Sequence, residues 1–120
     1  MNIQESQLKK NITKMLSDDY SMMIISCSLN KGKSINELSR ACNIPINTTY
    51  RRARDLVSQG LLIVEKTVIT DNGVKFDLYR SSINYVKIEW ISPDEPQIEI
   101  KLVENAIGKF VKVWNSFRMS

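Results

Sequence analysis

The chain has 120 residues, carries a net charge of +4, and is 42% hydrophobic and 25% charged. This composition is typical of a globular protein, and the length suffices for one hydrophobic core but not for two, so we expect a single domain over residues 1–120. No stretch contains the roughly 18 consecutive apolar residues of a membrane span, and the first residues lack the apolar segment of a signal peptide, which predicts a cytoplasmic protein without a membrane partner.

Two helices are predicted at the start of the chain. Residues 3–16 repeat apolar side chains at helical spacing. The segment "SDDY" then offers Ser17 or Asp18 as the N-cap of a second helix, "YSMMIISCSL". The apolar residues of this helix, Met22 and Met23 among them, are expected to pack in the core. The segment "NKGK" ends the helix.

A third helix begins at "SINE", residues 34–37, which has the spacing of a capping box. In such a box the Ser34 hydroxyl and the Glu37 carboxylate each accept a hydrogen bond from a backbone amide that the helix leaves free. The helix is expected to run to about Cys42. Its predicted buried residues are Ile35, Leu38 and Ala41.

A fourth helix is predicted from about residue 46 to residue 58. It follows the turn "CNIP" and precedes Gly60, which suits the left-handed position after a helix. Helical spacing predicts a buried stripe, which contains Ile46, Thr49, Ala53, Leu56 and Val57. The remaining surface then carries Asn47, Thr48, Tyr50, Arg51 and Arg54, with Arg52 toward one flank.

After Gly60 the apolar pattern changes from helical spacing to alternation. The runs "LLIVEKTVIT" and "VKFDLYRS" flank "DNG", in which Asn72 and Gly73 form the strongest short signal for a hairpin turn. A second hairpin is predicted from "INYVKIEWI" and "QIEIKL", joined by "SPDEP". Residues 61–102 are therefore expected to form two β-hairpins.

The last predicted element is a helix over about residues 103–117. Its large apolar residues are spaced by four and three, as in a heptad seam. These residues are Val103, Ile107, Phe110, Trp114 and Phe117. The seam predicts a homodimer interface, and packing of the seam within one chain is the alternative.

The positive charge of the chain is concentrated in residues 31–60. This quarter of the sequence has six basic and two acidic residues, whereas the segments before and after it are each neutral. Such a concentration predicts a surface that faces a polyanion. A helix with small polar residues at its start, followed by arginines, suits the DNA major groove, because arginine reads guanine or binds phosphate.

The order of these segments resembles the winged helix-turn-helix domain of archaeal and bacterial transcription regulators of the ArsR/MarR type. The resemblance covers about residues 17–82 and rests on "SINELSRACNIP", "INTTYRRARDLVSQGLL" and the strand–"DNG"–strand hairpin. It implies an α+β fold, in which a three-helix core carries a β-hairpin wing. The added elements are the N-terminal helix and, over residues 83–120, a second β-hairpin and a C-terminal dimerisation helix.

The function implied by this resemblance is sequence-specific binding of double-stranded DNA by a homodimeric, nucleoid-associated transcriptional regulator. The helix at residues 46–58 would enter the major groove. The residues expected to contact DNA are Lys33, Ser34, Asn47, Thr48, Tyr50, Arg51, Arg52, Arg54 and Lys75. Asp71 at the wing tip predicts a weak contact between the wing and phosphate, and the sequence indicates no particular effector.

Other functions find less support in the sequence. The chain has no histidine and only two cysteines, Cys27 and Cys42, which are too few for a four-ligand metal site and are expected to be buried, reduced thiols. Without a Gly-rich phosphate loop or paired carboxylates, we expect no enzyme activity, no catalytic residue, no metal and no cofactor. The alternative function is a winged helix that docks proteins through exposed aromatic residues, namely Tyr85, Trp90, Trp114 and Phe117.

Overall fold

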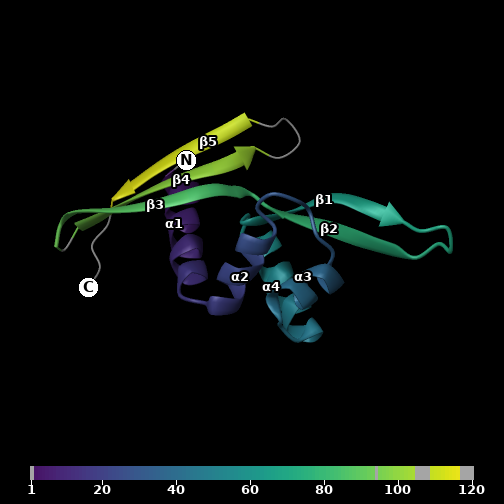
Figure 1. The fold of residues 1–120 in the computed structure, drawn as a ribbon. Coiled ribbons are helices and arrows are strands. Elements are labelled where there is room, and N and C mark those ends of the chain that lie inside the picture. Colours follow the sequence, from purple (N-terminus) through teal and green to yellow (C-terminus); the bar gives the residue numbers. More distant parts are fainter. Residues whose placement is uncertain (1, 94, 105–108, 117–120) are drawn as a thin grey trace. The chain divides into compact units, whose positions relative to one another are not determined.

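The computed structural model describes the backbone of residues 2–93, 95–104 and 109–116 (Figure 1). Over this part of the chain the fold is of the α+β class, with four helices followed by five strands. The helices are α1 (Asn2–Leu16), α2 (Asp19–Cys27), α3 (Ile35–Cys42) and α4 (Ile46–Ser58). The strands are β1 (Leu62–Ile69), β2 (Lys75–Ser81), β3 (Ile83–Ser92), β4 (Glu95–Glu104) and β5 (Lys109–Ser116).

The chain divides into two compact units, Met1–Ser82 and Ile83–Ser120. The first unit contains the four helices and the antiparallel β1–β2 hairpin, and the second contains an antiparallel sheet with the order β3-β4-β5. The division falls where the sequence analysis ends the predicted winged core, at residue 82. Among the described residues, no helix has the length and apolar character that crossing a membrane requires.

Helices α2, α3 and α4 pack on one another around fully buried apolar side chains. Ile24, Leu38 and Leu56, one from each helix, are at most 2% exposed. Burial of an aliphatic side chain of this size contributes roughly 1.5–3 kcal/mol to folding. Leu61 and Leu62 are equally buried, so they attach the base of the β1–β2 hairpin to the same core.

The ends of the helices follow the local signals in the sequence. The Ser34 hydroxyl accepts a hydrogen bond from the Glu37 amide, and the Glu37 carboxylate accepts one from the Ser34 amide, which confirms the predicted capping box. Helix α4 spans Ile46–Ser58 and is followed by Gly60 with φ +80°, as predicted. Between α3 and α4, Asn43 takes the left-handed conformation, with φ 55°.

The first hairpin also agrees with its prediction. Strands β1 and β2 pair in antiparallel register from Leu62 opposite Ser81 to Ile69 opposite Lys75. Gly73 has φ +81° in the connecting turn, a conformation that glycine adopts without steric cost. The loop before α3 joins this hairpin through a β-bridge, in which the Lys33 and Tyr79 backbones exchange hydrogen bonds of 2.9 and 2.7 Å.

The predicted C-terminal helix is wrong. Val103 lies in β4, Phe110 and Trp114 lie in β5, and Ile107 and Phe117 lie outside the described residues. The segment "KFVKVW" has an alternating pattern as well as a heptad pattern, and its valines favour strands. Strand β4 pairs with this segment, with Ile100 opposite Val113. The hydrogen bonds between the two strands form only when the segment is extended.

Four of the predicted burial positions are also wrong. Ile46 is 48% exposed, because it lies in the first turn of α4, before Thr49, the first buried residue of that helix. In α3 the buried face continues from Leu38 to Cys42, so Ala41 is exposed. Met22 and Met23 are both exposed on α2, whose buried residues are Ser21, Ile24 and Ile25.

Candidate nucleic-acid interface

Helix α4 has one buried and one exposed face. Thr49, Ala53 and Leu56 are at most 2% exposed and fix the orientation of the helix. Because Ala53 has only a methyl group, the backbone of α4 can pack close to its neighbours. The solvent-exposed side chains of the predicted DNA-binding set are Asn47, Tyr50, Arg51 and Arg54, while Thr48 is half-buried.

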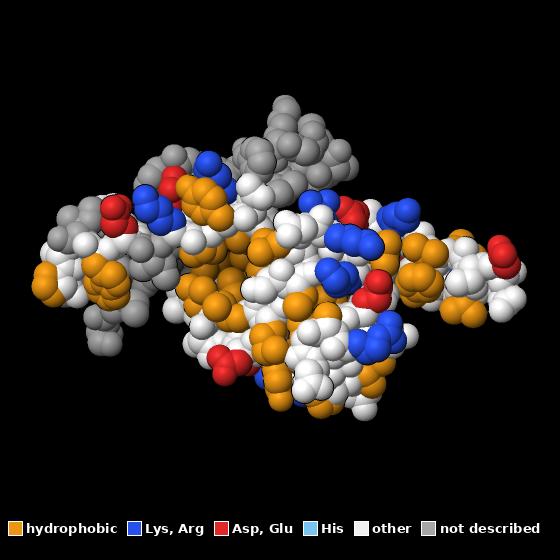
Figure 2. Space-filling model, in the orientation of Figure 1, with side chains coloured by type: hydrophobic (Ala, Val, Ile, Leu, Met, Phe, Trp, Pro, Cys, Tyr) orange, Lys and Arg blue, Asp and Glu red, His pale blue; other side chains and the backbone are white. Residues whose placement is uncertain are grey.

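The charge of this exposed face is not neutralised within the structure. Neither Arg51 nor Arg54 forms a salt bridge with any residue whose side chain is described. Figure 2 shows basic side chains over the helices, with acidic, hydrophobic and other side chains between them. Arginines that are free of intramolecular ion pairs can bind an anionic partner without first breaking such a pair.

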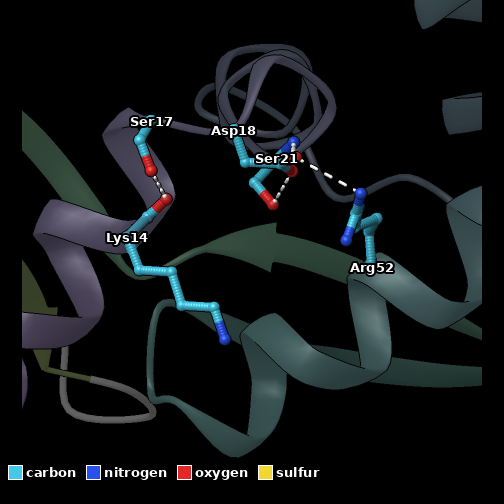
Figure 3. Close-up of polar contacts among 5 residues, drawn as sticks. All are labelled: Lys14, Ser17, Asp18, Ser21 and Arg52. Carbon is cyan, nitrogen blue, oxygen red and sulfur yellow. Dashed lines mark hydrogen bonds and ion pairs between the residues drawn. The ribbon is translucent and has the colours of Figure 1, made fainter.

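Arg52 differs from its two neighbours because it contacts the protein itself. Its guanidinium lies 3.3 Å from the Asp18 carboxylate and 6.0 Å from the centre of the Tyr20 ring (Figure 3). Asp18 is the N-cap of α2 and also accepts hydrogen bonds from the Ser21 hydroxyl and amide, at 2.6 and 2.9 Å. Arg52 therefore connects α4 to the start of α2.

Hydrogen bonds lower the pKa of the Asp18 carboxyl below its ordinary value of 3.8. The Ser21 hydroxyl is the largest cause, and the charge of Arg52 acts in the same direction against the opposing effect of burial. Asp18 is thus ionised at neutral pH, both as a helix cap and as the partner of Arg52. This arrangement makes Arg52 a structural residue, which the sequence analysis grouped with the DNA-binding residues.

Lys33 and Ser34 also have partners inside the protein. The Lys33 ammonium donates a hydrogen bond of 2.6 Å to the carbonyl oxygen of Cys27. Ser34 is buried, and its hydroxyl oxygen caps α3. The sequence identified the capping box but could not show that the same serine would be withdrawn from the surface.

A groove of about 900 Å³ lies between α3, Tyr50 of α4 and the β1–β2 hairpin. Three basic residues line it, namely Lys31, Arg40 and Lys75, and all three are exposed. None of them forms a salt bridge with a described side chain. The groove is therefore a second positively charged surface, adjacent to the exposed face of α4.

The acidic residues of the groove are engaged elsewhere. Glu37 belongs to the capping box, and Asp77 accepts a hydrogen bond of 2.7 Å from the Thr67 hydroxyl. Burial, followed by the nearby charge of Asp77, raises the pKa of Tyr79, so this tyrosine stays protonated and able to donate a hydrogen bond. Lys31 and Arg40 belong to the basic segment of residues 31–60, but no pattern in the sequence indicates that they line one groove.

The aromatic residues of the alternative docking surface belong to the second unit. The Tyr85 hydroxyl donates a hydrogen bond of 2.5 Å to the Glu99 carboxylate, and the Lys101 ammonium lies 4.9 Å from the centre of the Tyr85 ring. Trp90 is 56% exposed. Trp114 is in β5, and Phe117 lies outside the described residues, so Trp90 and Tyr85, which is 37% exposed, are the residues of this group that the structure shows to be exposed.

Comparisons with known proteins add no further evidence about the interface. A scan against models of protein families gives no match, and a search of curated proteins finds no significant relative.

We expect Asp18→Ala to lower the free energy of unfolding by about 1–2 kcal/mol, because it removes a helix cap together with the partner of Arg52. Asp19→Ala is the matched control. It removes the same charge from the first turn of α2 but no cap, so we expect a loss of about 0.5 kcal/mol. Urea unfolding at neutral pH measures the free energy of unfolding of both variants. Equal decreases in the two variants would contradict the role of Asp18 as helix cap and partner of Arg52.

The difference in stability between the unsubstituted protein and Asp18→Ala should also depend on pH. Because the folded-state pKa of Asp18 is lowered, its contribution is complete above the ordinary value of 3.8 and is lost as the pH falls through the lowered value. The stability difference between the unsubstituted protein and Asp18→Ala should therefore shrink as the pH is lowered below about 4.

Proposed function

We propose that this protein is a sequence-specific, double-stranded DNA-binding transcriptional regulator with a winged helix-turn-helix fold, associated with the nucleoid and without enzymatic activity. The observation that carries the proposal is the exposed face of α4, where Arg51 and Arg54 stand beside Asn47 and Tyr50 without salt-bridge partners among the described residues. In this reading α3 is the positioning helix, α4 is the recognition helix and the β1–β2 hairpin is the wing.

The recognition helix has the side chains that direct readout requires. Asn47 precedes the arginines and is small enough to approach a base edge at the start of the helix. Arginine forms two hydrogen bonds with the O6 and N7 atoms of guanine, whereas an arginine that meets phosphate contributes affinity without sequence preference. Arg51 is one turn after Asn47, so it would contact bases, and Arg54 would contact the backbone.

The groove beside α4 would hold the phosphate backbone. Lys31, Arg40 and Lys75 supply three positive charges there, and the Tyr79 hydroxyl supplies a hydrogen-bond donor. The tip of the wing offers less, since Asp71 lies between the exposed apolar residues Ile69 and Val74. Electrostatic binding would therefore depend on Lys75, Lys31 and Arg40 rather than on Asp71 and its neighbours in the turn.

Replacement of both Arg51 and Arg54 by alanine should abolish sequence-specific DNA binding without unfolding the protein. Arg51→Ala alone should weaken binding to a selected duplex by about 1–3 kcal/mol and relax sequence preference, because it loses a contact with a base. The selected duplex would come from a random library, and fluorescence anisotropy would measure affinity for it and for a scrambled duplex.

Lys10→Ala is the control for this experiment, because it removes one exposed positive charge from α1 and leaves the exposed side chains of α4 unchanged. It should change affinity for either duplex only slightly. If the Arg51/Arg54 double variant bound the selected duplex as tightly as the unsubstituted protein, the assignment of α4 as the recognition helix would be refuted.

If the groove holds the phosphate backbone, its basic residues should determine how strongly DNA affinity depends on salt. Each of Lys31→Ala, Arg40→Ala and Lys75→Ala should weaken binding to all duplexes alike and reduce the slope of log affinity against log salt by about 0.9, as expected for one lost phosphate contact. Lys66→Ala, which removes an exposed lysine from the same hairpin outside the groove, should leave the slope unchanged. Equal slopes in all four variants would place the phosphate backbone elsewhere.

We also propose that the protein binds DNA as a homodimer. A single recognition helix covers few base pairs, and a two-fold pair places two such helices about 34 Å apart on one face of the duplex. The helical seam predicted from the sequence cannot form this dimer, because its described residues lie in β4 and β5. The proposal therefore rests on the geometry of DNA recognition.

Sedimentation equilibrium of the full chain at micromolar concentration should give twice the 13.8 kDa of one chain. The complex with a palindromic duplex should contain two chains for each duplex. A monomer that binds such a duplex in a one-to-one complex with undiminished affinity would rule out the dimer and leave monomeric DNA binding in place.

A further inference from the structure

The two cysteines of the chain lie together although fifteen positions separate them. Cys27 is the last residue of α2 and Cys42 is the last residue of α3. The Cys42 thiol donates a hydrogen bond to the Cys27 sulfur, and the two sulfur atoms are 2.9 Å apart. Both residues are free thiols in this structure. The sequence predicted two buried thiols but not that they would meet.

The surroundings distinguish the two sulfurs. Cys42 is buried, its thiol also lies 3.4 Å from the Met23 carbonyl oxygen, and burial together with the neighbouring Cys27 raises its pKa to about 12. Cys27 is only half-buried. A small dissolved reagent therefore reaches Cys27 first, while Cys42 is held beside it as a second, protected sulfur.

A positive charge stands next to this pair. The Lys33 ammonium is fixed by its hydrogen bond to the Cys27 carbonyl oxygen. Its charge lowers the pKa of Cys42, against the larger effects of burial and of Cys27, which raise it. The fold brings Lys33 to the pair from the loop after α2. A partly exposed thiol, a second thiol in contact and a nearby cation are the features of an oxidation-sensitive site.

We propose that Cys27 and Cys42 form an oxidation site, at which a small hydroperoxide converts the two thiols into an intramolecular disulfide. The Cys27 sulfur, as thiolate, attacks one peroxide oxygen, the oxygen–oxygen bond breaks, and Cys27 becomes a sulfenic acid. The Cys42 sulfur then attacks the Cys27 sulfur, the sulfur–oxygen bond breaks, and the released hydroxide takes the Cys42 proton. With hydrogen peroxide, two thiols and one peroxide give one disulfide and two molecules of water.

The disulfide would join the ends of α2 and α3 across the loop that contains Lys33 and Ser34. It restricts the unfolded chain without requiring movement of the exposed face of α4, so the oxidised protein should unfold at a temperature roughly 5–10 °C higher than the reduced protein. This inference is independent of the proposed DNA binding, because neither sulfur belongs to the recognition helix or to the groove.

The test treats the reduced full-length protein with hydrogen peroxide and follows free thiols, intact mass and peptide maps under non-reducing conditions. The expected product is a monomeric chain that has lost two hydrogen atoms and both free thiols, contains a peptide in which Cys27 is linked to Cys42, and returns to the starting mass with dithiothreitol. Cys42→Ser should stop at a sulfenic acid on Cys27, which dimedone captures, whereas Cys27→Ser should react much more slowly.

The measurement on the unsubstituted protein decides the matter even if a serine variant does not fold. Retention of both thiols in excess peroxide, sulfinic acid on either residue without the disulfide, or disulfides only between chains would each overturn the proposal.

Discussion

The packing of α4 through Thr49, Ala53 and Leu56 is the constraint on which the rest of the candidate interface depends. These residues have almost no exposure, and the buried Thr49 hydroxyl has a partner, because it donates its hydrogen bond to the Pro45 carbonyl oxygen at the start of the same helix. Once this stripe is buried against α2 and α3, helical geometry determines which side chains face the solvent. The exposure of Arg51 and Arg54 is a consequence of that packing.

The same constraint divides three arginines between two roles. Arg52 is beside the buried stripe and meets Asp18, whose carboxylate already caps α2, whereas Arg51 and Arg54 point away from the helices. A cation held by an internal carboxylate is a weaker ligand for phosphate than a free one, because the internal pair must first be broken. One turn of α4 therefore contains Arg52, which stabilises the fold, and Arg51 and Arg54, which are proposed to bind DNA. A count of charges alone would not distinguish the three arginines.

The β1–β2 hairpin is attached to the helices at its base and carries Lys75 at its other end, beside the turn. Leu61 and Leu62 are buried in the helical core, and the bridge between Lys33 and Tyr79 ties β2 to the loop before α3. This attachment brings Lys75 into the same groove as Lys31 and Arg40, which are distant from it in the sequence. The turn itself, residues 70–74, carries Asp71 and no basic residue. The hairpin therefore gives the proposed backbone contact a fixed position beside α4.

The sequence by itself determined the elements whose signals are local, and the tertiary structure decided every feature that needs a distant partner. The bounds of α4, the capping box at Ser34 and the turn at Gly73 follow from interactions within a few residues. Residues 109–116 have both a helical and an alternating pattern, and only hydrogen bonding to β4 made them a strand. Likewise, the pairing of Arg52 with Asp18 and the contact of Cys27 with Cys42 join segments far apart in the sequence, so no local spacing could reveal them.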